Sequence, residues 1–108
     1  MKNRVLIVAA HPDDEILGCG GTIARFVKEG YEAYTLILGE GVTARDKKQG
    51  RKTPSEAIVN LKKEARRANS IIGVKEVIMN DLPDNRFDAV QLLDIVKMIE
   101  STKRKIKP

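Results

Sequence analysis

Apolar residues occur along this chain in blocks, with polar residues gathered between them. Two blocks, Arg4 to Ala10 (RVLIVAA) and Ala33 to Leu38 (AYTLIL), lack the in-out alternation of a half-exposed strand, and a shorter one spans Val74 to Met79. Continuous apolar runs of this length are typical of parallel strands that are covered on both faces. The pattern therefore predicts three buried strands.

The segments that follow these runs show helical spacing. The first predicted helix runs from Asp14 to Glu29, with Gly30 suited to its C-terminus, and the third runs from Ala89 to Ser101 after a loop at residues 80–88. The first of these helices is expected to face the sheet with Ile16, Ile23, Ala24 and Val27. The other is expected to face it with Leu92, Val96 and Ile99.

The second predicted helix has the clearest start. Thr53 is placed to cap its N-terminus, Pro54 occupies the first helical position, and Glu56 completes a capping box. Gly73 marks its end. Its expected apolar stripe consists of Ala57, Leu61, Ala65, Ala68 and Ile72.

These elements alternate as β-α-β-α-β-α, which predicts an α/β fold with right-handed crossovers. We expect a Rossmann-like arrangement of three layers, in which a parallel sheet carries helices on both faces. The length of 108 residues suits a single domain, and no internal repeat suggests a second one.

Composition narrows the function classes. The formal net charge is +5, but the excess lies in two runs, Lys47 to Lys52 and Lys103 to Lys107, with no interleaved aromatic residue on which a base could stack. We therefore expect solvated basic surfaces and no nucleic-acid partner. The single cysteine, Cys19, excludes an internal disulfide, and no apolar stretch approaches the roughly 20 residues that span a membrane. These features predict a cytoplasmic protein without a membrane span.

The first strand leads directly into the segment His11-Pro12-Asp13-Asp14-Glu15. Ligands of open parallel sheets bind at the carboxyl ends of the strands, so this segment lies where a site is expected. His11, the only histidine, and a carboxylate three positions on could reach one metal ion, and mixed nitrogen and oxygen ligands suit zinc. A second carboxylate beside the metal could take a proton from water. The spacing leaves open another interpretation, in which both aspartates cap the helix and complement its dipole.

The segment Ala10 to Glu15 (AHPDDE) resembles the signature of the PIG-L/LmbE-like zinc-dependent N-deacetylases. The resemblance continues through residues 17–24 (LGCGGTIA), the loop from Gly39 to Arg45, the helix end at residues 68–74 and the stretch at residues 82–88 (LPDNRFD). It covers the chain in order, and the signature directly follows an apolar first strand.

This resemblance implies zinc-dependent removal of an N-acetyl group from an amino-sugar-type substrate, with release of acetate and a free amine. It implies that His11 and Asp14 are zinc ligands and that Asp13 is the general base that activates water. Arg45, Asn85 and Arg86 are candidate substrate-binding residues. A solvated loop around Arg45 and a turn held by Asx side chains around Asn85 explain these residues equally well.

One part of the family's pattern is absent. The resemblance implies a third zinc ligand, a histidine after a further strand, whereas this sequence has no second histidine. In the strand order 3-2-1-4 of a Rossmann-like sheet, the missing fourth strand would leave the first strand at an open edge. We therefore expect the chain to be the N-terminal part of a deacetylase domain, inactive by itself and prone to form homo-oligomers.

Two alternatives compete with a deacetylase. One is a non-catalytic binding module of the same fold, which keeps the substrate loops without the metal. The other is a phosphoacceptor receiver domain, because Asp13, Asp14, Asp81 and the pair Lys107-Pro108 imitate its acidic and lysine positions. The receiver interpretation requires a further strand, helix and strand between Asp81 and Lys107, where the chain has room for one helix.

The first helix carries three glycines around the cysteine, at positions 18, 20 and 21. They suggest a dinucleotide-binding turn, but they lie inside the predicted helix, and Ile23 occupies the place of the third glycine of that fingerprint. We expect instead that they allow the helix to pack closely and that Cys19 is a small packing residue.

Overall fold

The computed structural model describes residues 2–39, 54–82 and 91–108. In chain order the elements are β1 (Arg4–Ala9), α1 (Asp14–Lys28), β2 (Glu32–Gly39), α3 (Pro54–Ile71), β3 (Glu76–Leu82) and α4 (Leu92–Ile106). The predicted alternation of strands and helices is confirmed. The second predicted helix begins at Pro54 as expected, and its proposed cap Thr53 lies outside the described residues.

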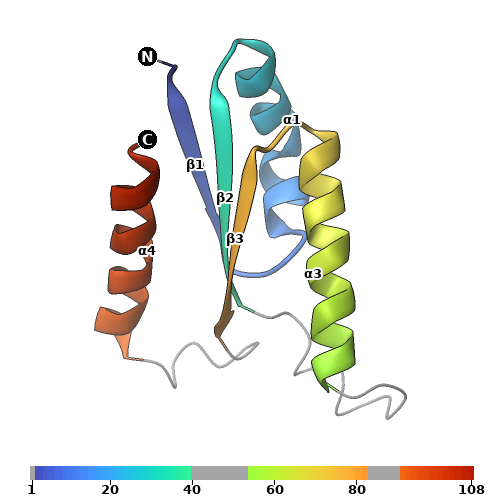
Figure 1. The fold of residues 1–108 in the computed structure, drawn as a ribbon, viewed down its shortest axis with the longest axis vertical. Coiled ribbons are helices and arrows are strands. Elements are labelled where there is room, and N and C mark those ends of the chain that lie inside the picture. The colour runs from blue at the N-terminus through green and yellow to red at the C-terminus, as the bar shows by residue number, and fades with distance from the viewer. Residues whose placement is uncertain (1, 40–53, 83–90) are drawn as a thin grey trace.

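The three strands form one parallel sheet in the order β1-β2-β3 (Figure 1). The register between β1 and β2 runs from the pair Arg4 and Glu32 to the pair Ala9 and Ile37. The central strand β2 is the most deeply buried element, with residues 33–39 all buried, which agrees with its continuous apolar sequence. Among the described strands β1 lies at an edge, as expected. Because it has a described neighbour on one side only, its residues are mostly intermediate or exposed, and the prediction that it is buried on both faces is wrong. The carboxyl ends of all three strands meet at one end of the sheet.

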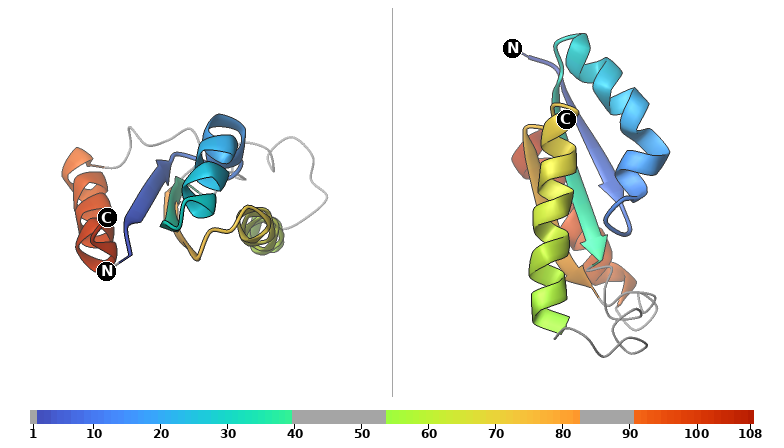
Figure 2. Two further views of the ribbon diagram at one scale, coloured as in Figure 1. Left: turned by 90° about the horizontal axis from the view of Figure 1, so that it is seen from above. Right: turned by 90° about the vertical axis from the view of Figure 1, so that its right-hand side faces the viewer.

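Helices cover both faces of this sheet, so the predicted three-layer, Rossmann-like α/β arrangement is confirmed. Helices α1 and α3 lie on one face and α4 lies on the other (Figure 2). The core on the α1 and α3 face is built around Ile23, Ala33 and Val74. The core on the α4 face is built around Leu36, Leu38 and Leu82, with Ile95, Met98 and Ile99 of α4 packed against it.

Several predicted element boundaries differ from the structure, since β3 begins at Glu76 and not at Val74, and α4 begins at Leu92 and not at Ala89. The third strand is not followed by a loop at Asn80, because β3 continues alongside β2 until Leu82 pairs with Gly39. Parallel pairing satisfies the hydrogen bonds of the backbone N–H and C=O groups whatever the side chains are. The polar residues at positions 80 and 81 therefore do not end the strand. Helix α4 continues past Ser101 to Ile106.

The predicted inward face of α4 is partly wrong. Leu92 and Val96 are 75% and 39% exposed, whereas Ile99 packs against the sheet as expected. The inward face is instead formed by Ile95, Met98 and Ile99 and continues to the buried residues Thr102 and Ile106. Six of the eight residues from 92 to 99 are apolar, so helical spacing alone allows more than one inward face.

The expected packing role of the glycine-rich segment of α1 is also wrong. A Cβ atom added to Gly18 or Gly21 would meet no heavy atom within 4 Å. Cys19 and Ala24 are exposed, although Ile23 is buried as predicted. This part of α1 therefore presents small residues to the outside.

Candidate functional site

The acidic segment predicted as a site connects β1 to α1 at the carboxyl edge of the sheet. The backbone N–H of Gly39 donates a hydrogen bond of 2.7 Å to the carbonyl of Ala10, which ties the end of β1 to the end of β2. The chain then turns through His11 and Pro12, and α1 begins at Asp14. The buried sheet thus fixes the point at which these side chains emerge.

His11 and Asp14 are in direct contact. Oδ2 of Asp14 accepts a hydrogen bond of 3.1 Å from the backbone N–H of His11. The same oxygen lies 3.3 Å from Nδ1 of the His11 imidazole ring. The backbone N–H of Asp14 in turn donates to the carbonyl of His11 at 3.2 Å. The side chains are 32% and 53% exposed, so this pair is accessible from solvent while its geometry is held by the turn.

Asp13 has an unusual backbone conformation. Its φ is 85°, in the left-handed region that L-residues other than asparagine and aspartate rarely adopt. It occupies the N-cap position of α1, and its carbonyl accepts a hydrogen bond of 2.8 Å from Leu17 N–H, but its side chain makes no capping hydrogen bond. The interpretation of Asp13 as a simple helix cap is therefore not supported, and its exposed carboxylate remains available for chemistry.

Glu15, the next acidic residue, is buried and belongs to a polar network that the sequence did not reveal. Its Oε1 accepts a hydrogen bond of 3.0 Å from Nδ2 of Asn69, which also donates to the carbonyl of Ala65 at 2.8 Å. Oδ1 of Asn69 accepts a bond of 3.0 Å from the hydroxyl of Thr35. If the side-chain amide of Asn69 were flipped, its oxygen would face the carboxylate of Glu15 and the carbonyl of Ala65, which are both acceptors. The network therefore fixes the orientation of this amide.

Two features of the sequence could have indicated these partners. Asn69 lies four residues after the buried Ala65, on the inward face of its helix, and Thr35 is a hydroxyl residue inside an otherwise apolar strand. What could not be read from the sequence is that Asn69 bonds to Glu15 and to Thr35 at the same time.

The His11 and Asp14 pair fits two positions of a zinc site. Two ligand atoms that lie about 2.0–2.1 Å from a tetrahedral ion are about 3.3 Å apart, and Nδ1 of His11 and Oδ2 of Asp14 are 3.3 Å apart. One imidazole nitrogen and one carboxylate oxygen are also ordinary zinc ligands. Within residues 2–39, 54–82 and 91–108 there is no group of three or more His, Cys, Asp or Glu side chains that could hold a metal ion.

The other predicted site residues cannot be placed. Arg45, Asn85 and Arg86 lie outside the described residues. Strands β2 and β3 end at Gly39 and Leu82, at the same edge of the sheet as His11. Their role as substrate contacts stays a prediction.

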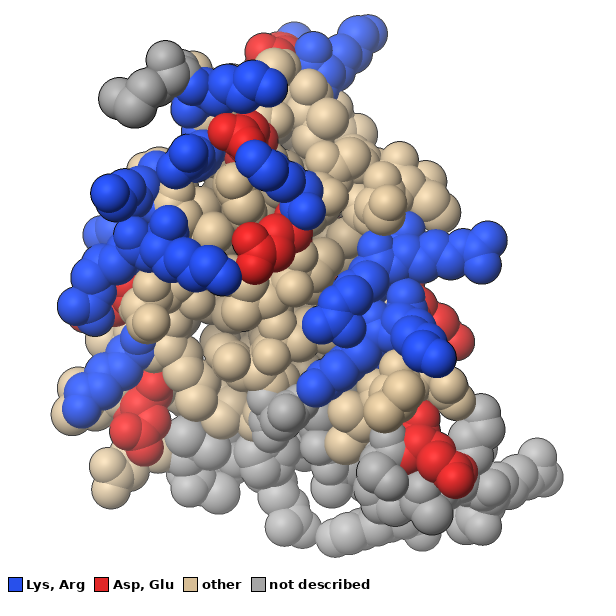
Figure 3. Space-filling view, in the orientation of Figure 1, with Lys and Arg blue, Asp and Glu red and all other residues tan. Residues whose placement is uncertain are grey.

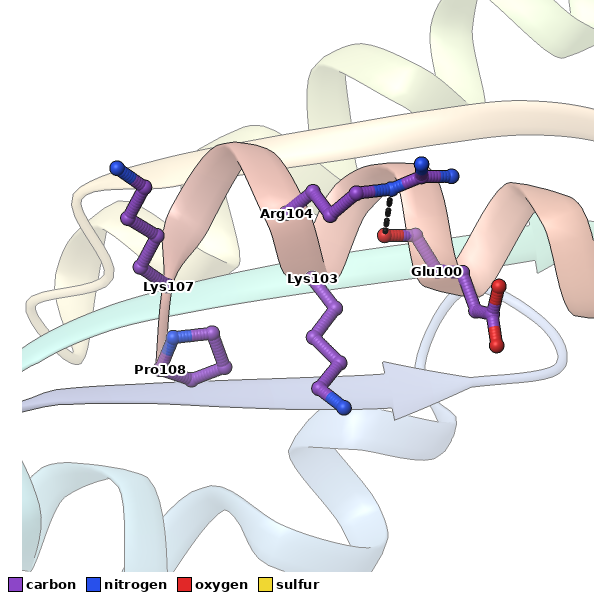
Figure 4. A pocket seen from close by; sticks show the side chains of 5 residues that line it. All are labelled: Glu100, Lys103, Arg104, Lys107 and Pro108. Carbon is purple, nitrogen blue, oxygen red and sulfur yellow. Dashed lines mark hydrogen bonds between the residues drawn. The ribbon is translucent and has the colours of Figure 1, made fainter.

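Two cavities at the other end of the sheet are separate from this site. One, of about 400 Å³, is lined by Glu100, Lys103, Arg104, Lys107 and Pro108 (Figure 4). The second, of about 600 Å³, lies beside it near the start of β1 and is also bordered by Lys107 and Pro108. In Figure 4 the three basic side chains extend in different directions from α4, so they do not converge on one point.

The basic residues are spread over the surface. Figure 3 shows Lys and Arg side chains over α4 and the start of β1 on one side, and over α3 on the other, with acidic side chains between them. Several are paired, as in the contact of 3.1 Å between Lys105 and Glu76. This distribution agrees with the expected solvated surface at Lys103 to Lys107, whereas the run from Lys47 to Lys52 lies outside the described residues. No helix in the described parts of the chain is both long and apolar enough to cross a bilayer.

Comparison with known proteins shows which family this sequence matches. The family model described as GlcNAc-PI de-N-acetylase (PIG-L) matches residues 6–108. The uncharacterized deacetylase YaiS of Escherichia coli is 29% identical over 99 residues, which cover 92% of this chain and 48% of that protein. The diacetylchitobiose deacetylase of Thermococcus kodakarensis is 29% identical over 105 residues, which cover 97% of this chain and 38% of that protein.

A solved structure is similar over the whole chain. GalB, the 4-carboxy-2-hydroxymuconate hydratase of Pseudomonas putida, matches with a TM-score of 0.81 and 27% identity, covering 100% of this chain and 45% of that one. The chain therefore spans less than half the length of each of these three proteins.

Proposed function

Because this chain belongs to the GlcNAc-PI de-N-acetylase (PIG-L) family, we propose that it carries the water-activating part of a zinc-dependent N-deacetylase. The substrate would be an N-acetylated amino sugar or a conjugate of one. The observation that carries the proposal is the contact of 3.3 Å between His11 Nδ1 and Asp14 Oδ2 beside the exposed carboxylate of Asp13. Family membership also removes the reason to consider a phosphoacceptor receiver domain.

In this proposal three residues of the segment, His11, Asp13 and Asp14, take part in the chemistry. His11 and Asp14 would hold the zinc ion, with a further ligand from outside the described residues. When bound, zinc would lower the pKa of water to about 7 and would polarise the acetyl carbonyl. Asp13 accepts the proton that water loses as its oxygen attacks the carbonyl carbon. The bond between that carbon and nitrogen then breaks, and Asp13 returns the proton to the leaving nitrogen, giving acetate and a free amine.

The helix that follows supports this assignment. Asp13 and Asp14 lie at the N-terminus of α1, where unpaired backbone N–H groups and the helix dipole favour negative charge. Since the side chain of Asp13 makes no capping bond, its carboxylate can serve as a base without disrupting the helix start. The sheet-anchored turn holds both aspartates in place before any ligand binds.

A second candidate function is hydration of an unsaturated acid. It is favoured by one observation, the similarity of the whole chain to the hydratase from Pseudomonas putida. Addition of water to a carbon–carbon double bond also needs a base for the water proton, so the same Asp13 could serve. Deacetylation is the better candidate because both the matching family model and the two sequence relatives carry that activity in their descriptions.

The first experiment is a zinc competition titration against a chromogenic chelator with the full chain. Asp14→Asn and His11→Ala remove proposed ligands, and Asp94→Asn makes the same change as Asp14→Asn in the first turn of α4. We expect zinc affinity to fall at least tenfold in the two ligand variants and to stay unchanged in Asp94→Asn. Absence of zinc binding by the unmodified chain, or equal affinity in both Asp→Asn variants, would overturn the zinc site and favour the non-catalytic module.

Product analysis separates the two enzymatic candidates and also tests the expectation that the chain is inactive by itself. Acetate release from N,N′-diacetylchitobiose supports deacetylation and contradicts that expectation. Loss of the conjugated absorbance of an unsaturated dicarboxylate, without acetate release from the sugar, would support hydration instead.

A further inference from the structure

The burial of Glu15 is not explained by stability. Its side chain is 1% exposed, its Oε1 accepts one hydrogen bond, and its Oε2 is buried without a hydrogen-bond partner among the described residues. Burying a polar group that is only partly hydrogen-bonded is unfavourable, and an apolar side chain of similar volume would often be at least as stable. A buried carboxylate at this position therefore points to a role in local geometry.

The network of Glu15 joins three elements at the start of α1. Through Asn69 it reaches α3, and through the hydroxyl of Thr35 it reaches the central strand β2. Asn69 and Thr35 are both fully buried, at 0% exposure. Since Asn69 donates to Glu15 and accepts from Thr35, a shift of the first turn of α1 would break its bond to an amide that is itself held by the central strand.

The neighbouring residue Asp13 needs such support. A left-handed conformation at a residue other than glycine costs free energy and persists when the surrounding structure holds it. Glu15 lies two residues after Asp13 and directly after Asp14, so it is the nearest buried side chain through which the core can hold both. The backbone bonds of the turn fix its shape, and the network fixes where that turn lies relative to the sheet.

We propose that Thr35 and Asn69 are positioning residues that act through Glu15 to hold Asp13 and Asp14 in the geometry of the site. This inference rests on the proposed function, because it assigns the network to the proposed base and zinc ligand. It differs from a packing role, in which the shapes of these side chains would matter and their hydrogen bonds would not.

Three single variants distinguish the two roles. Thr35→Val keeps the shape and removes the hydroxyl, whereas Thr35→Ser keeps the hydroxyl and removes a methyl group. Thr102→Val is the matched control, since Thr102 is a buried threonine of α4 whose hydroxyl donates to the carbonyl of Met98 at 3.0 Å. A packing role predicts that serine is the more harmful substitution at position 35, and a positioning role predicts that valine is.

Two measurements on the full chain are needed. Zinc affinity, measured by competition titration, should weaken about three- to tenfold in Thr35→Val and recover in Thr35→Ser. This loss is at the low end of what substitution of a residue that supports a metal ligand usually causes. Hydrogen exchange without metal should accelerate at the amides of Asp14 and Leu17, which donate within the turn, while the amides of α4 keep their protection. Thr102→Val should change neither quantity at the site.

Each outcome decides the inference. Equal effects of valine and serine at position 35, or exchange that rises throughout the protein, would overturn it. If the unmodified chain binds no zinc, the proposed function fails, and the exchange of Asp14 and Leu17 alone decides whether the network positions the turn. Asn69→Leu serves as a second variant and should reproduce the local exchange of Thr35→Val.

Discussion

Gly73 lies directly against Val27: a Cβ atom added to Gly73 would come within 2.7 Å of Cγ1 of Val27. Gly73 follows α3, and Val27 lies in the last turn of α1, so the contact sets how closely the two helices approach on one face of the sheet. Gly73 also has a φ of 94°, which favours glycine independently of the contact.

The first prediction separates these two requirements. Gly30 has the same φ of 94° but no heavy atom within 4 Å of an added Cβ, so Gly30→Ala tests the backbone conformation alone. We expect Gly30→Ala to lower the free energy of unfolding by about 1 kcal/mol and Gly73→Ala by roughly 1–3 kcal/mol more. Urea unfolding measures both. Equal losses would show that the end of α3 can move away from α1 without cost.

The second prediction concerns the pH dependence of stability. The hydrogen bond from Lys75, with further help from Arg4, holds the pKa of Glu32 below its ordinary value of 4.5. Ionised Glu32 therefore stabilises the folded state above pH 4.5, and this contribution is lost as the pH falls through the lowered folded-state value. Glu32→Gln should flatten the acid side of the stability curve measured by urea unfolding.

The dependence of stability on alkaline pH follows from Lys75, the partner of Glu32. The same contact raises the pKa of Lys75 above 10.5, so its contribution is complete below that pH and is lost as the pH rises through the raised folded-state value. Lys75→Met should reproduce much of the acid effect of Glu32→Gln, because it removes the largest cause of the shift in Glu32. Lys105→Met, which breaks an exposed pair with Glu76, is the control. An unchanged acid slope in Lys75→Met would contradict the assignment.

The third prediction is a gain in stability at the proposed site. Asp13→Gly removes a side chain from a left-handed residue and should raise the free energy of unfolding by up to about 1 kcal/mol. Asp94→Gly places glycine in the first turn of α4 and should lower it by about 0.5 kcal/mol. A loss above about 0.5 kcal/mol in Asp13→Gly would show that the carboxylate helps to cap α1 after all.

The fourth prediction tests the inward face of α4. Leu92 is 75% exposed, so Leu92→Ala should change the free energy of unfolding by less than about 0.5 kcal/mol. Ile99 packs in the core on the α4 face, and Ile99→Ala should cost about 2 kcal/mol or more. The opposite ranking would restore the face that sequence spacing suggested.

The fold could be predicted from the sequence because continuous apolar runs mark its strands, although β2 is buried at residues 33–39 and β1 only in part. Continuous apolar runs leave few alternatives to a parallel sheet, and helices between them impose the crossovers, so the positions of β1, β2 and His11 followed directly. The inward face of α4 could not be predicted, since the apolar residues from 92 to 99 surround most of the helix. Packing against Leu36 and Leu38 selects the face, and those residues belong to another element.

The candidate site was predictable in part for a related reason. His11, Asp13 and Asp14 are neighbours in the sequence, so a local turn brings them together. Glu15 bonds to Asn69, which is 54 residues away, and Asn69 bonds to Thr35, which is 34 residues from it, so the network depends on the tertiary structure. A buried asparagine looks like any polar residue of a surface helix until the helix is placed on the sheet.

The parallel register of the sheet has a kinetic consequence. No two neighbouring strands are joined by a hairpin, so β1 can pair with β2 only after the intervening helix segment has closed a loop, and the pairing of β2 with β3 requires a longer one. Each closure costs chain entropy before any ladder bond compensates for it. We expect folding on the slow side for a chain of this length. Until β2 is covered, an almost uninterrupted apolar strand is open to pairing with other chains, so aggregation during refolding should increase steeply with protein concentration.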